Sequence, residues 1–447
     1  MKLRHSNRGS VLIIVLWVTI GLVSMALYFA NSMALELRAS DNRASGIAAD
    51  QAIEGAARYV TYVLTTYATN GVVPDTSEYQ AAAVPVGDAH FWIIGRDNSL
   101  TAQTDRVSFG LVDEASKLNL NTASTNALSG LPRMTTDLTS AILDWRGTNG
   151  SGASQIYYAM QNPSYQCKNA PFETVDELRL VYGTSLDILA GDDVNRNGIL
   201  DPNEKSDSGD GQVNPGLFEY LTVYSREPNV NSNGVMLVNV NNHGQLATLL
   251  QSTFGTARAT QIIQSLSRAA RPGSTNSPAG MTLIPSTSLL QFYRRSGMTE
   301  NEFAQIYPAV TVSTAPYTRG RVNINTASAT VLSCLPGMDT GTAQQVINYR
   351  QQNPNNLTSI AWIVDALGAS SSAIQALQAV DCLTTQSYQF TADIAAVGPY
   401  GRGYRRVKFV FDLSEGTTNI VYRQDLSRLG WALGEDVRQT WVAKATP

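Results

Sequence analysis

Charge and histidine are both scarce in this chain of 447 residues. Charged residues make up 15% of the sequence, and 32 Lys and Arg against 36 Asp and Glu leave a formal net charge of −4. This balance offers no basic surface to a polyanionic partner. The histidines are too scattered to predict a metal cluster or a catalytic triad, being His5, His90 and His243. Nucleotide-binding, hydrolase and metalloprotease motifs are also missing, so the sequence does not predict an enzyme.

Cysteine is equally scarce. Cys167, Cys334 and Cys382 permit at most one intramolecular disulfide. Two interpretations carry similar weight: Cys334 pairs with Cys382 in an oxidising compartment, or the thiols are free and buried. The chain is nevertheless long enough to form two or three domains with substantial cores.

Oxygen-bearing side chains are concentrated in residues 193–204, which read DVNRNGILDPNE. They occupy positions one, three, five, nine and twelve, and Gly198 holds position six, where an EF-hand-type calcium loop turns sharply. The backbone carbonyl at position seven adds another oxygen, and calcium takes about six to eight. The alternative is an Asn/Asp/Gly-rich surface turn without metal. The predicted calcium ligands are Asp193, Asn195, Asn197, Ile199, Asp201 and Glu204.

The flanks of this loop favour a structural calcium site over a calcium switch. A sensor EF-hand needs a long helix on either side, but only the short apolar stretch SLDILAG precedes the loop. After the loop, Pro202 and the run EKSDSGDGQVNPG predict further irregular structure. Three additional acidic residues either complete a second metal site or add negative potential, namely Asp192, Asp207 and Asp210.

The N-terminus combines a basic start with a long uncharged segment. Lys2, Arg4 and Arg8 precede a run without charge from Ser10 to Leu35. The run is long enough to span a bilayer as a helix and too long for the apolar part of an ordinary secretory signal. The positive charges before it predict a cytoplasmic N-terminus, with the rest of the chain outside, which in a bacterium is the periplasm.

This N-terminus resembles that of type IV prepilin-like proteins, in which a basic leader is cut after a glycine. The resemblance implies cleavage between Gly9 and Ser10 by a prepilin peptidase. The apolar periodicity of residues 47–64 predicts that the helix continues in amphipathic form, like the spine of a pilin. Most such subunits carry Glu at the fifth position after the cut, where this chain has Ile14. Lacking that Glu is typical of the K-type minor pseudopilin of type II secretion.

The middle of the chain contains an internal duplication. Residues 119–146 align without a gap with residues 323–350, and both copies begin with Asn, contain Leu-Pro and end with Arg. A weaker third copy begins at Val238. Each unit is predicted to form a short capped helix, a tight turn and a second helix, with Thr122 or Ser124 as the cap of the first copy.

The repeated pattern resembles the helix-hairpin-helix family, in which hairpin glycines leave backbone amides free to face a DNA phosphate. The copy at 323–350 keeps only Gly337, the copy at 119–146 has no hairpin glycine, and neither carries a basic stripe. Nucleic-acid binding is therefore not predicted. Degenerate helical modules of this kind are also inserted into the heads of K-type pseudopilins, which strengthens that resemblance.

Strand signals flank the helical units at HFWIIGR, RVSFGLVDE, FEYLTVYSRE, SYQFTADIAAVG, YRRVKFVFDL and NIVYRQDL. The predicted fold class is α+β, with a pilin-like long N-terminal helix packed on an antiparallel sheet and inserted all-α domains of the helix-hairpin-helix or SAM-like kind. The predicted segments are the leader (1–9), the transmembrane spine (10–35), the core helix and first strands (36–112), a helical insertion with the calcium loop (113–215), a strand with a second helical insertion (216–320), a helix-hairpin-helix-like repeat (321–385) and C-terminal strands (386–447).

Together, the leader without Glu, the calcium loop and the helical insertions resemble the general secretion pathway protein K family of minor pseudopilins. The resemblance implies a non-enzymatic tip subunit of the periplasmic pseudopilus of type II secretion, anchored by a single pass in the inner membrane. The implied partners are the I- and J-type minor pseudopilins, the major pseudopilin and prepilin peptidase, with calcium as cofactor. Two alternatives stay open: a DNA-binding component of a DNA-uptake (competence) pilus, and a membrane-anchored periplasmic enzyme.

Overall fold

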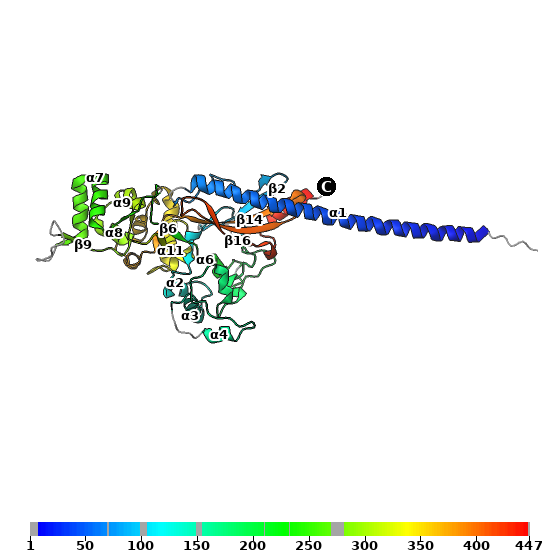
Figure 1. Ribbon diagram of the computed structural model, residues 1–447, viewed down its shortest axis with the longest axis horizontal. Helices are drawn as coiled ribbons and strands as arrows, with labels where there is room; N and C mark the ends of the chain where they lie inside the picture. Colours follow the sequence, from blue (N-terminus) through cyan, green and yellow to red (C-terminus); the bar gives the residue numbers. More distant parts are fainter. Residues whose placement is uncertain are drawn as a thin grey trace, which may run out of the picture.

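A single long helix forms one side of the molecule. The computed structural model describes residues 8–68, 71–98, 105–148, 154–209, 211–231, 233–269 and 281–445. Helix α1 (Arg8–Tyr67) projects far beyond the rest of the chain at its N-terminal end and lies on the folded head at its other end (Figure 1). It is exposed from Val11 to Ala44 and buried on one side from Ser45 onward. The predicted continuation of the spine helix into the head is confirmed.

The buried half of α1 covers one face of a six-stranded antiparallel sheet. The strand order is β1-β2-β14-β15-β16, and β3 also pairs with β14. The central strand β14 is buried along its whole length. Small side chains on α1, such as Ala52 and Ala56, share a core with Phe390 and Phe409 of the sheet, because only a small residue lets a helix backbone approach such bulk closely. The strands are β1 (Val84–Val86), β2 (Ala89–Ile94), β3 (Val112–Asp113), β14 (Gln389–Val397), β15 (Arg405–Asp412) and β16 (Asn419–Asp425).

Three modules are inserted between the strands of this sheet, and each is closed by a parallel pair of two-residue strands. Module 1 (118–222) is closed by β4 (Leu118–Asn119) and β5 (Leu221–Thr222). Module 2 (238–311) is closed by β7 (Val238–Asn239) and β10 (Val310–Thr311). Module 3 (322–384) is closed by β12 (Val322–Asn323) and β13 (Leu383–Thr384). The weak repeat predicted at Val238 is therefore a third module of the same kind.

The three closures use equivalent residues. The threonine that ends each closing strand accepts a backbone hydrogen bond through its carbonyl oxygen, from Leu120 at 2.8 Å, Val240 at 2.9 Å and Ile324 at 3.0 Å. The asparagine that ends each opening strand accepts a bond from the backbone N–H two residues later at 3.0, 2.9 and 2.9 Å, respectively. These side chains shape the turn into the first helix, a role that Asn fills readily. Helices α2 and α10 are then capped by Ser124 and Ser328.

The helices of the modules are short. Module 1 holds α2 (Thr125–Ser129), α3 (Thr136–Trp145), α4 (Gln155–Ala159), η3 (Val175–Leu180), α5 (Leu186–Leu189) and α6 (Leu217–Tyr220). Module 2 holds α7 (His243–Leu266), β8 (Ser267–Ala269), β9 (Met281–Leu283), α8 (Leu289–Ser296), α9 (Glu300–Ile306) and η4 (Tyr307–Ala309). Module 3 holds α10 (Ala329–Ser333), α11 (Thr340–Gln352), η5 (Pro354–Asn356), α12 (Trp362–Leu367) and α13 (Ser372–Leu377). Helix α7 breaks at Gly255, whose φ is 77°, so it too is a helix-turn-helix.

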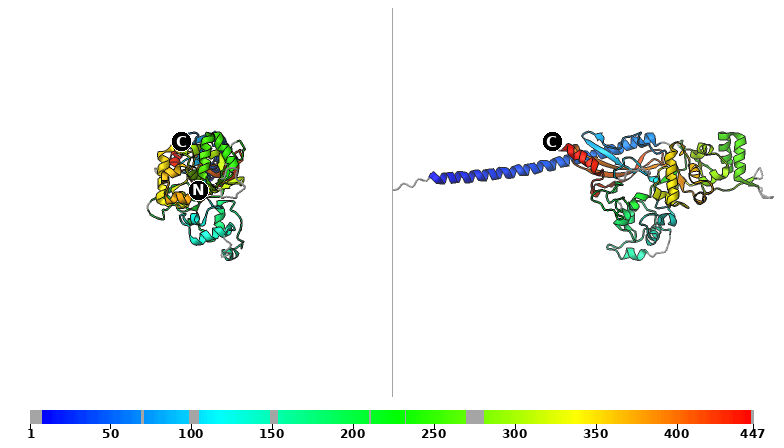
Figure 2. Two further views of the ribbon diagram at one scale, coloured as in Figure 1. Left: turned by 90° about the vertical axis from the view of Figure 1, so that its left-hand side faces the viewer. Right: turned by 180° about the vertical axis from the view of Figure 1, so that it is seen from behind.

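Module 2 lies at the end of the head farthest from the projecting part of α1, and module 1 extends from the side opposite α1 (Figures 1 and 2). The remaining elements link modules and sheet. They are η2 (Glu114–Ser116), β6 (Arg226–Pro228), β11 (Tyr317–Arg319), η6 (Pro399–Gly401), η7 (Ser427–Leu429) and the C-terminal helix α14 (Gly434–Ala445).

Two strand predictions differ from the structure. FEYLTVYSRE is not one strand but helix α6 followed by β5 and β6, because this segment has to close module 1 and then leave it. RVSFGLVDE contributes only β3 and a single bridge between Phe109 and Ile94. Module 1 also ends at Thr222 rather than at 215. The sequence also predicts an exposed linker at residues 271–288. Residues 271–280 lie outside the described residues, and Met281–Leu283 form strand β9, which pairs with β8.

All three cysteines are free in this structure. Cys167 and Cys334 are buried, and the Cys334 thiol donates to the carbonyl oxygen of Thr330 at 3.2 Å. Of the two interpretations of the cysteines, the structure adopts the one with free thiols.

Candidate functional site

The oxygen-rich loop at residues 193–204 lies between module 1 and the sheet. Its nearest helices are the four-residue α5 before it and α6 after it, so the predicted absence of long flanking helices is confirmed. The chain reverses at Arg196 and Gly198, whose φ angles are 59° and 88°. Only glycine adopts such angles without steric cost, which explains the glycine at position six.

The predicted ligands are brought together around the interior of the loop. Asp193 accepts hydrogen bonds from the backbone N–H groups of Asn197 at 2.9 Å and Gly198 at 2.8 Å. Glu204 accepts from the backbone N–H groups of Asn195 at 3.1 Å and Asp201 at 3.1 Å. These contacts bend the loop back on itself, with both terminal carboxylates turned inward.

The centre of the loop is an Asp201 carboxylate oxygen faced by two side-chain amides. Asn195 donates to this oxygen at 2.5 Å and Asn197 at 2.8 Å. Both amides are buried, as is Ile199, whose carbonyl was the predicted ligand at position seven. Rotating either amide by half a turn would direct its oxygen inward instead of its nitrogen. Across the described residues no group of three or more His, Cys, Asp or Glu side chains could hold a metal ion. Any cation here would therefore have to combine carboxylate oxygens with amide and carbonyl oxygens, a donor set that suits calcium.

Burial disfavours the ionised forms of two carboxylates of the loop. It raises the pKa of Asp193 to about 6, although nearby Arg96 opposes this shift. Burial also raises the pKa of Glu204, against the hydrogen bonds that it accepts from Asn195 and Asp201. Removing these carboxylates from water disfavours their ionised forms, and a bound cation would reverse that preference.

Two arginines from the sheet hold the outside of the loop. Arg406 of β15 is completely buried and donates to the carbonyl oxygens of Asn195 and Arg196, the latter at 2.8 Å. It also forms an ion pair with Asp393 of β14 at 2.6 Å. Arg96, just after β2, donates to the Arg196 carbonyl oxygen at 3.1 Å and pairs with Glu219 at 2.8 Å. Sequence reasoning missed this clamp, because these arginines lie in other parts of the chain.

The neighbouring acidic residues are organised by another arginine that the sequence did not point to. Arg133 pairs with Asp192 and with Asp207, each at 2.9 Å. Asp192 also accepts from the side chain of Asn214 at 3.2 Å. The sequence left open whether Asp192 and Asp207 belong to a second metal site. In the structure, the guanidinium of Arg133 supplies the positive charge beside both carboxylates. Asp210 lies outside the described residues.

At the N-terminus, the predicted cleavage site falls at the start of α1. Gly9 and Ser10 lie in the first turn of the helix, and the leader residues 1–7 lie outside the described residues. The segment after them forms a helix long and apolar enough to cross a membrane. Ile14, the fifth residue after the predicted cut, is exposed along that helix.

Packing covers the helix-hairpin-helix turn of module 3. In module 3, a Cβ atom on Gly337 would lie 2.6 Å from Cβ of Ala376, because α13 packs over the hairpin. In module 1, Arg133 occupies the equivalent position with φ of 60°. The arginines that end the two repeats also point inward: Arg146 donates to the Leu120 carbonyl oxygen at 2.8 Å, and Arg350 to that of Ala327 at 2.7 Å. The arginines that end both repeats are therefore engaged in hydrogen bonds within the chain.

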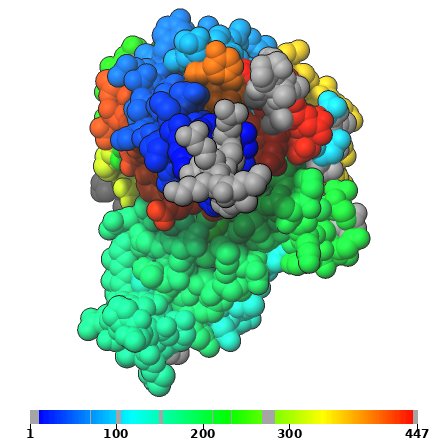
Figure 3. Space-filling model, turned by 90° about the vertical axis from the view of Figure 1, so that its right-hand side faces the viewer, coloured from blue at the N-terminus to red at the C-terminus, as the bar shows by residue number. Residues whose placement is uncertain are grey.

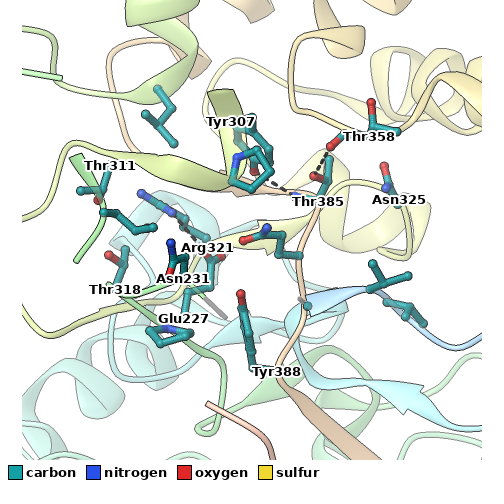
Figure 4. Close-up of a pocket in the computed structure, with 18 of the residues that line it drawn as sticks. Glu227, Asn231, Tyr307, Thr311, Thr318, Arg321, Asn325, Thr358, Thr385 and Tyr388 are labelled. Atoms are coloured by element: carbon teal, nitrogen blue, oxygen red, sulfur yellow. Dashed lines mark hydrogen bonds and ion pairs between the residues drawn. The ribbon is translucent and has the colours of Figure 1, made fainter. Parts of the chain in front are cut away.

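A cavity of about 700 Å³ lies where modules 2 and 3 meet the segment after α1. Figure 4 shows Tyr307, Arg321, Glu227 and Tyr388 around it. Arg321 is 6% exposed and pairs with Glu227 at 2.8 Å and with Asp381 at 2.5 Å, which ties strand β6 to module 3. None of the predicted site residues lines this cavity.

The projecting apolar helix, the antiparallel sheet beneath its second half and the helical modules inserted between strands place the fold in the pilin-like class. The apolar helix fits a single-pass membrane anchor. Residues 116–191 match the family model of type II secretion system (T2SS) protein K, and residues 318–363 match that of the helix-hairpin-helix motif. The first match lies almost entirely within module 1 and supports a type II secretion minor pseudopilin of the K type. The second falls on module 3, whose turn is covered by α13.

No curated protein matches the chain by sequence. A solved structure described as the GspK-GspI-GspJ complex from the enterotoxigenic Escherichia coli type 2 secretion system is similar at 10% identity and a TM-score of 0.38. The similarity covers 90% of this chain and 99% of that chain.

Proposed function

We propose that the chain is a minor pseudopilin of type II secretion that occupies the tip of the periplasmic pseudopilus and primes its assembly. The observation that carries this proposal is Ile14. In a bundle of apolar helices, a carboxylate at this position would neutralise the N-terminal amine of the neighbouring subunit above. An isoleucine cannot do so, and a subunit without this pairing is best placed where no subunit stands above it.

The shape of the head supports the same position. Module 1 extends sideways from the sheet and module 2 extends beyond the end of α1 (Figures 1 and 2). Both would obstruct neighbouring heads within a helical array, whereas the end of a filament leaves room for them. The function is then structural, with no covalent chemistry, and the helical modules serve as packing and docking surfaces.

The proposed partners are the I- and J-type minor pseudopilins, with the major pseudopilin below them. The similar solved structure is itself a complex of GspK with GspI and GspJ. Full-length chain co-expressed with I- and J-type subunits should elute with both in detergent. An Ile14→Glu variant should retain the complex of heads, since the substitution lies in the apolar helix. Loss of its place at the filament end would show that the missing carboxylate, and not the bulk of the head, sets that position. Elution of this chain alone would contradict the proposal.

Processing and orientation follow from the same proposal. A prepilin peptidase is expected to cut between Gly9 and Ser10, leaving a chain that starts SVLIIV and spans the inner membrane once, with the head in the periplasm. Intact mass of the membrane-extracted protein would test this. A mature N-terminus at Met1, or a cut after Ala30 or Ala34, would contradict it.

We further propose that residues 193–204 bind calcium and that calcium has a structural role there. The support is the inward arrangement of Asp193, Asp201 and Glu204 and the buried amides between them. When bound, calcium would supply the positive charge that these carboxylates lack. The residues that would hold it are the predicted ones, with Arg96 and Arg406 fixing the loop from outside.

The competing proposal is a DNA-binding component of a competence pilus. The covered turn at Gly337 and the inward arginines Arg146 and Arg350 oppose it. Binding of duplex DNA at several salt concentrations would discriminate, since phosphate contacts weaken steeply with salt. Tight, salt-sensitive binding that disappears in the Arg146→Ala and Arg350→Ala variants would favour the competence pilus.

A further inference from the structure

The loop between β14 and β15, residues 398–404, holds an exposed aromatic residue in an unusual backbone conformation. Tyr400 has φ of 57° and ψ of 28°, and it is 71% exposed. Bulky residues rarely adopt this left-handed conformation, because Cβ crowds the following carbonyl oxygen. Such high exposure means that packing within the head does not explain why a tyrosine is held this way. Strained, exposed residues of this kind point to a contact outside the chain.

The 398–404 loop contacts α1 at a fixed position along the helix. Cβ atoms on Gly398 and Gly403 would lie 2.3 and 2.4 Å from backbone atoms of Ser45, so only glycine permits this approach. A little closer to the N-terminus of α1, Arg402 pairs with Asp41 at 3.5 Å. The loop therefore sits rigidly beside the stretch of α1 from Asp41 to Ser45.

That stretch lies just beyond the membrane-spanning part of α1. The first ionisable residue after the apolar run is Glu36, five residues before Asp41, which corresponds to about 7–8 Å along a helix. The headgroup layer extends about 5–8 Å beyond each side of a hydrocarbon core that is about 30 Å thick. The apolar run from Ser10 to Leu35 would be about 39 Å long, so the helix must tilt or emerge partly, and tilting brings the head still closer to the bilayer.

Figure 3 looks along α1 from its N-terminal end, onto the face of the head that would lie against the bilayer. Tyrosine is favoured at membrane surfaces because its ring is apolar and its hydroxyl is polar. The guanidinium of Arg402 and the carboxylate of Asp41 neutralise each other, so this contact does not require anionic lipid. We propose that the 398–404 loop rests on the membrane surface in the subunit before assembly, with Tyr400 in the headgroup layer. This proposal rests on the single-pass anchoring proposed above.

Quenching by brominated lipid tests the contact. The full-length chain and a Tyr400→Trp variant are reconstituted into phosphatidylcholine vesicles with bromine placed near the headgroup or deep in the acyl chains. The emission added by Tyr400→Trp should be quenched strongly by the shallow bromines and weakly by the deep ones. The matched control is Tyr62→Trp, which is also exposed on the head but lies 21 residues beyond Asp41, or about 31 Å farther from the bilayer. Its added emission should not be quenched.

The native Trp17, the eighth residue of the apolar run, reports insertion independently. If deep bromines quench the parent through Trp17, but Tyr400→Trp is quenched no more than Tyr62→Trp, the surface contact is overturned while the anchoring stands. If the parent shows no quenching by deep bromines, the anchoring and the proposal that rests on it both fail.

Discussion

Gly130 and Cys334 occupy the same position in modules 1 and 3 and lie against each other. A Cβ atom on Gly130 would lie 3.1 Å from Sγ of Cys334. The two modules thus meet through equivalent surfaces, as the two halves of a symmetric dimer do. The internal duplication therefore has a structural consequence beyond similar folds, because the copies serve as each other's packing partner.

This contact predicts that a Gly130→Cys variant forms a disulfide with Cys334 on mild oxidation. An S–S bond of about 2.05 Å places each Cβ about 3 Å from the partner sulfur, which matches the observed spacing. Gly130 has φ of −76°, so a cysteine is unstrained there. Peptide mapping of the non-reduced protein should find the crosslink, and Cys334→Ser in the same background should abolish it. A variant that folds but stays reduced would contradict the packing of modules 1 and 3.

The sequence was informative where its signal is local. Four features depend on residues close together in the chain and were predicted correctly. They are the spine helix, the strands β14 to β16, the hairpin repeats and the gathering of oxygen-bearing side chains within residues 193–204. The module closures could not be predicted, because Thr222 and Thr384 belong to two-residue strands whose partners lie far away in the sequence. Nor could Arg406 be assigned to the loop, since a single arginine in a strand carries no sign of its distant carbonyl partners.

Arg406 predicts a large loss of stability on substitution. Arg406→Met would leave Asp393 ionised and buried without its partner, and would free two loop carbonyl groups that now accept hydrogen bonds. Removing one partner of a buried ion pair costs about 3–5 kcal/mol. Urea unfolding of residues 36–447 would measure this cost.

The neighbouring Arg405 is the matched control. Its ion pair with Asp50 is about half exposed on both sides, so Arg405→Met should cost less than about 1 kcal/mol. Equal effects of the two substitutions would show that Arg406 does not act as a buried clamp.

Asp113 predicts a pH-dependent stability. Asp113 ends strand β3, and its carboxylate accepts hydrogen bonds from Asn323 at 3.0 Å and Ser387 at 2.6 Å, yet burial raises its pKa to about 6. The folded state therefore holds the proton more tightly than the unfolded state, whose pKa is about 3.9. This contribution to stability is fully present below about pH 4 and is lost as the pH rises to about 6.

An Asp113→Asn variant cannot titrate at this position. The unfolding free energy of the parent should fall relative to that of the variant by up to about 3 kcal/mol between pH 4 and pH 7, since each pKa unit corresponds to about 1.4 kcal/mol. Urea unfolding across this range gives the difference between the two proteins directly. A difference that does not change with pH would mean that Asp113 titrates like an exposed carboxyl.

Calcium should stabilise the head through the 193–204 loop. Binding to the folded state alone raises the free energy of unfolding by about 2.7 kcal/mol when free calcium is 100 times its dissociation constant. Magnesium should stabilise less, because it requires a tighter octahedral arrangement than a flexible set of amide, carbonyl and carboxylate oxygens provides. Thermal unfolding of residues 36–447 with calcium, with magnesium and with chelator measures both effects.

The same measurement on variants locates the site. Asp193→Ala with Glu204→Ala removes the two carboxylates that close the loop, so the melting temperature of this double variant should no longer respond to chelator. Asp187→Ala, which removes an exposed carboxylate before the loop, should respond as the parent does. Calcium binding should slow hydrogen exchange within the loop and at Arg406, which donates hydrogen bonds to carbonyl groups of the loop. Exchange in the edge strand β16 should change little. If chelator leaves the parent unchanged and the double variant melts like the parent, residues 193–204 form a polar turn held by Arg96 and Arg406 without a metal.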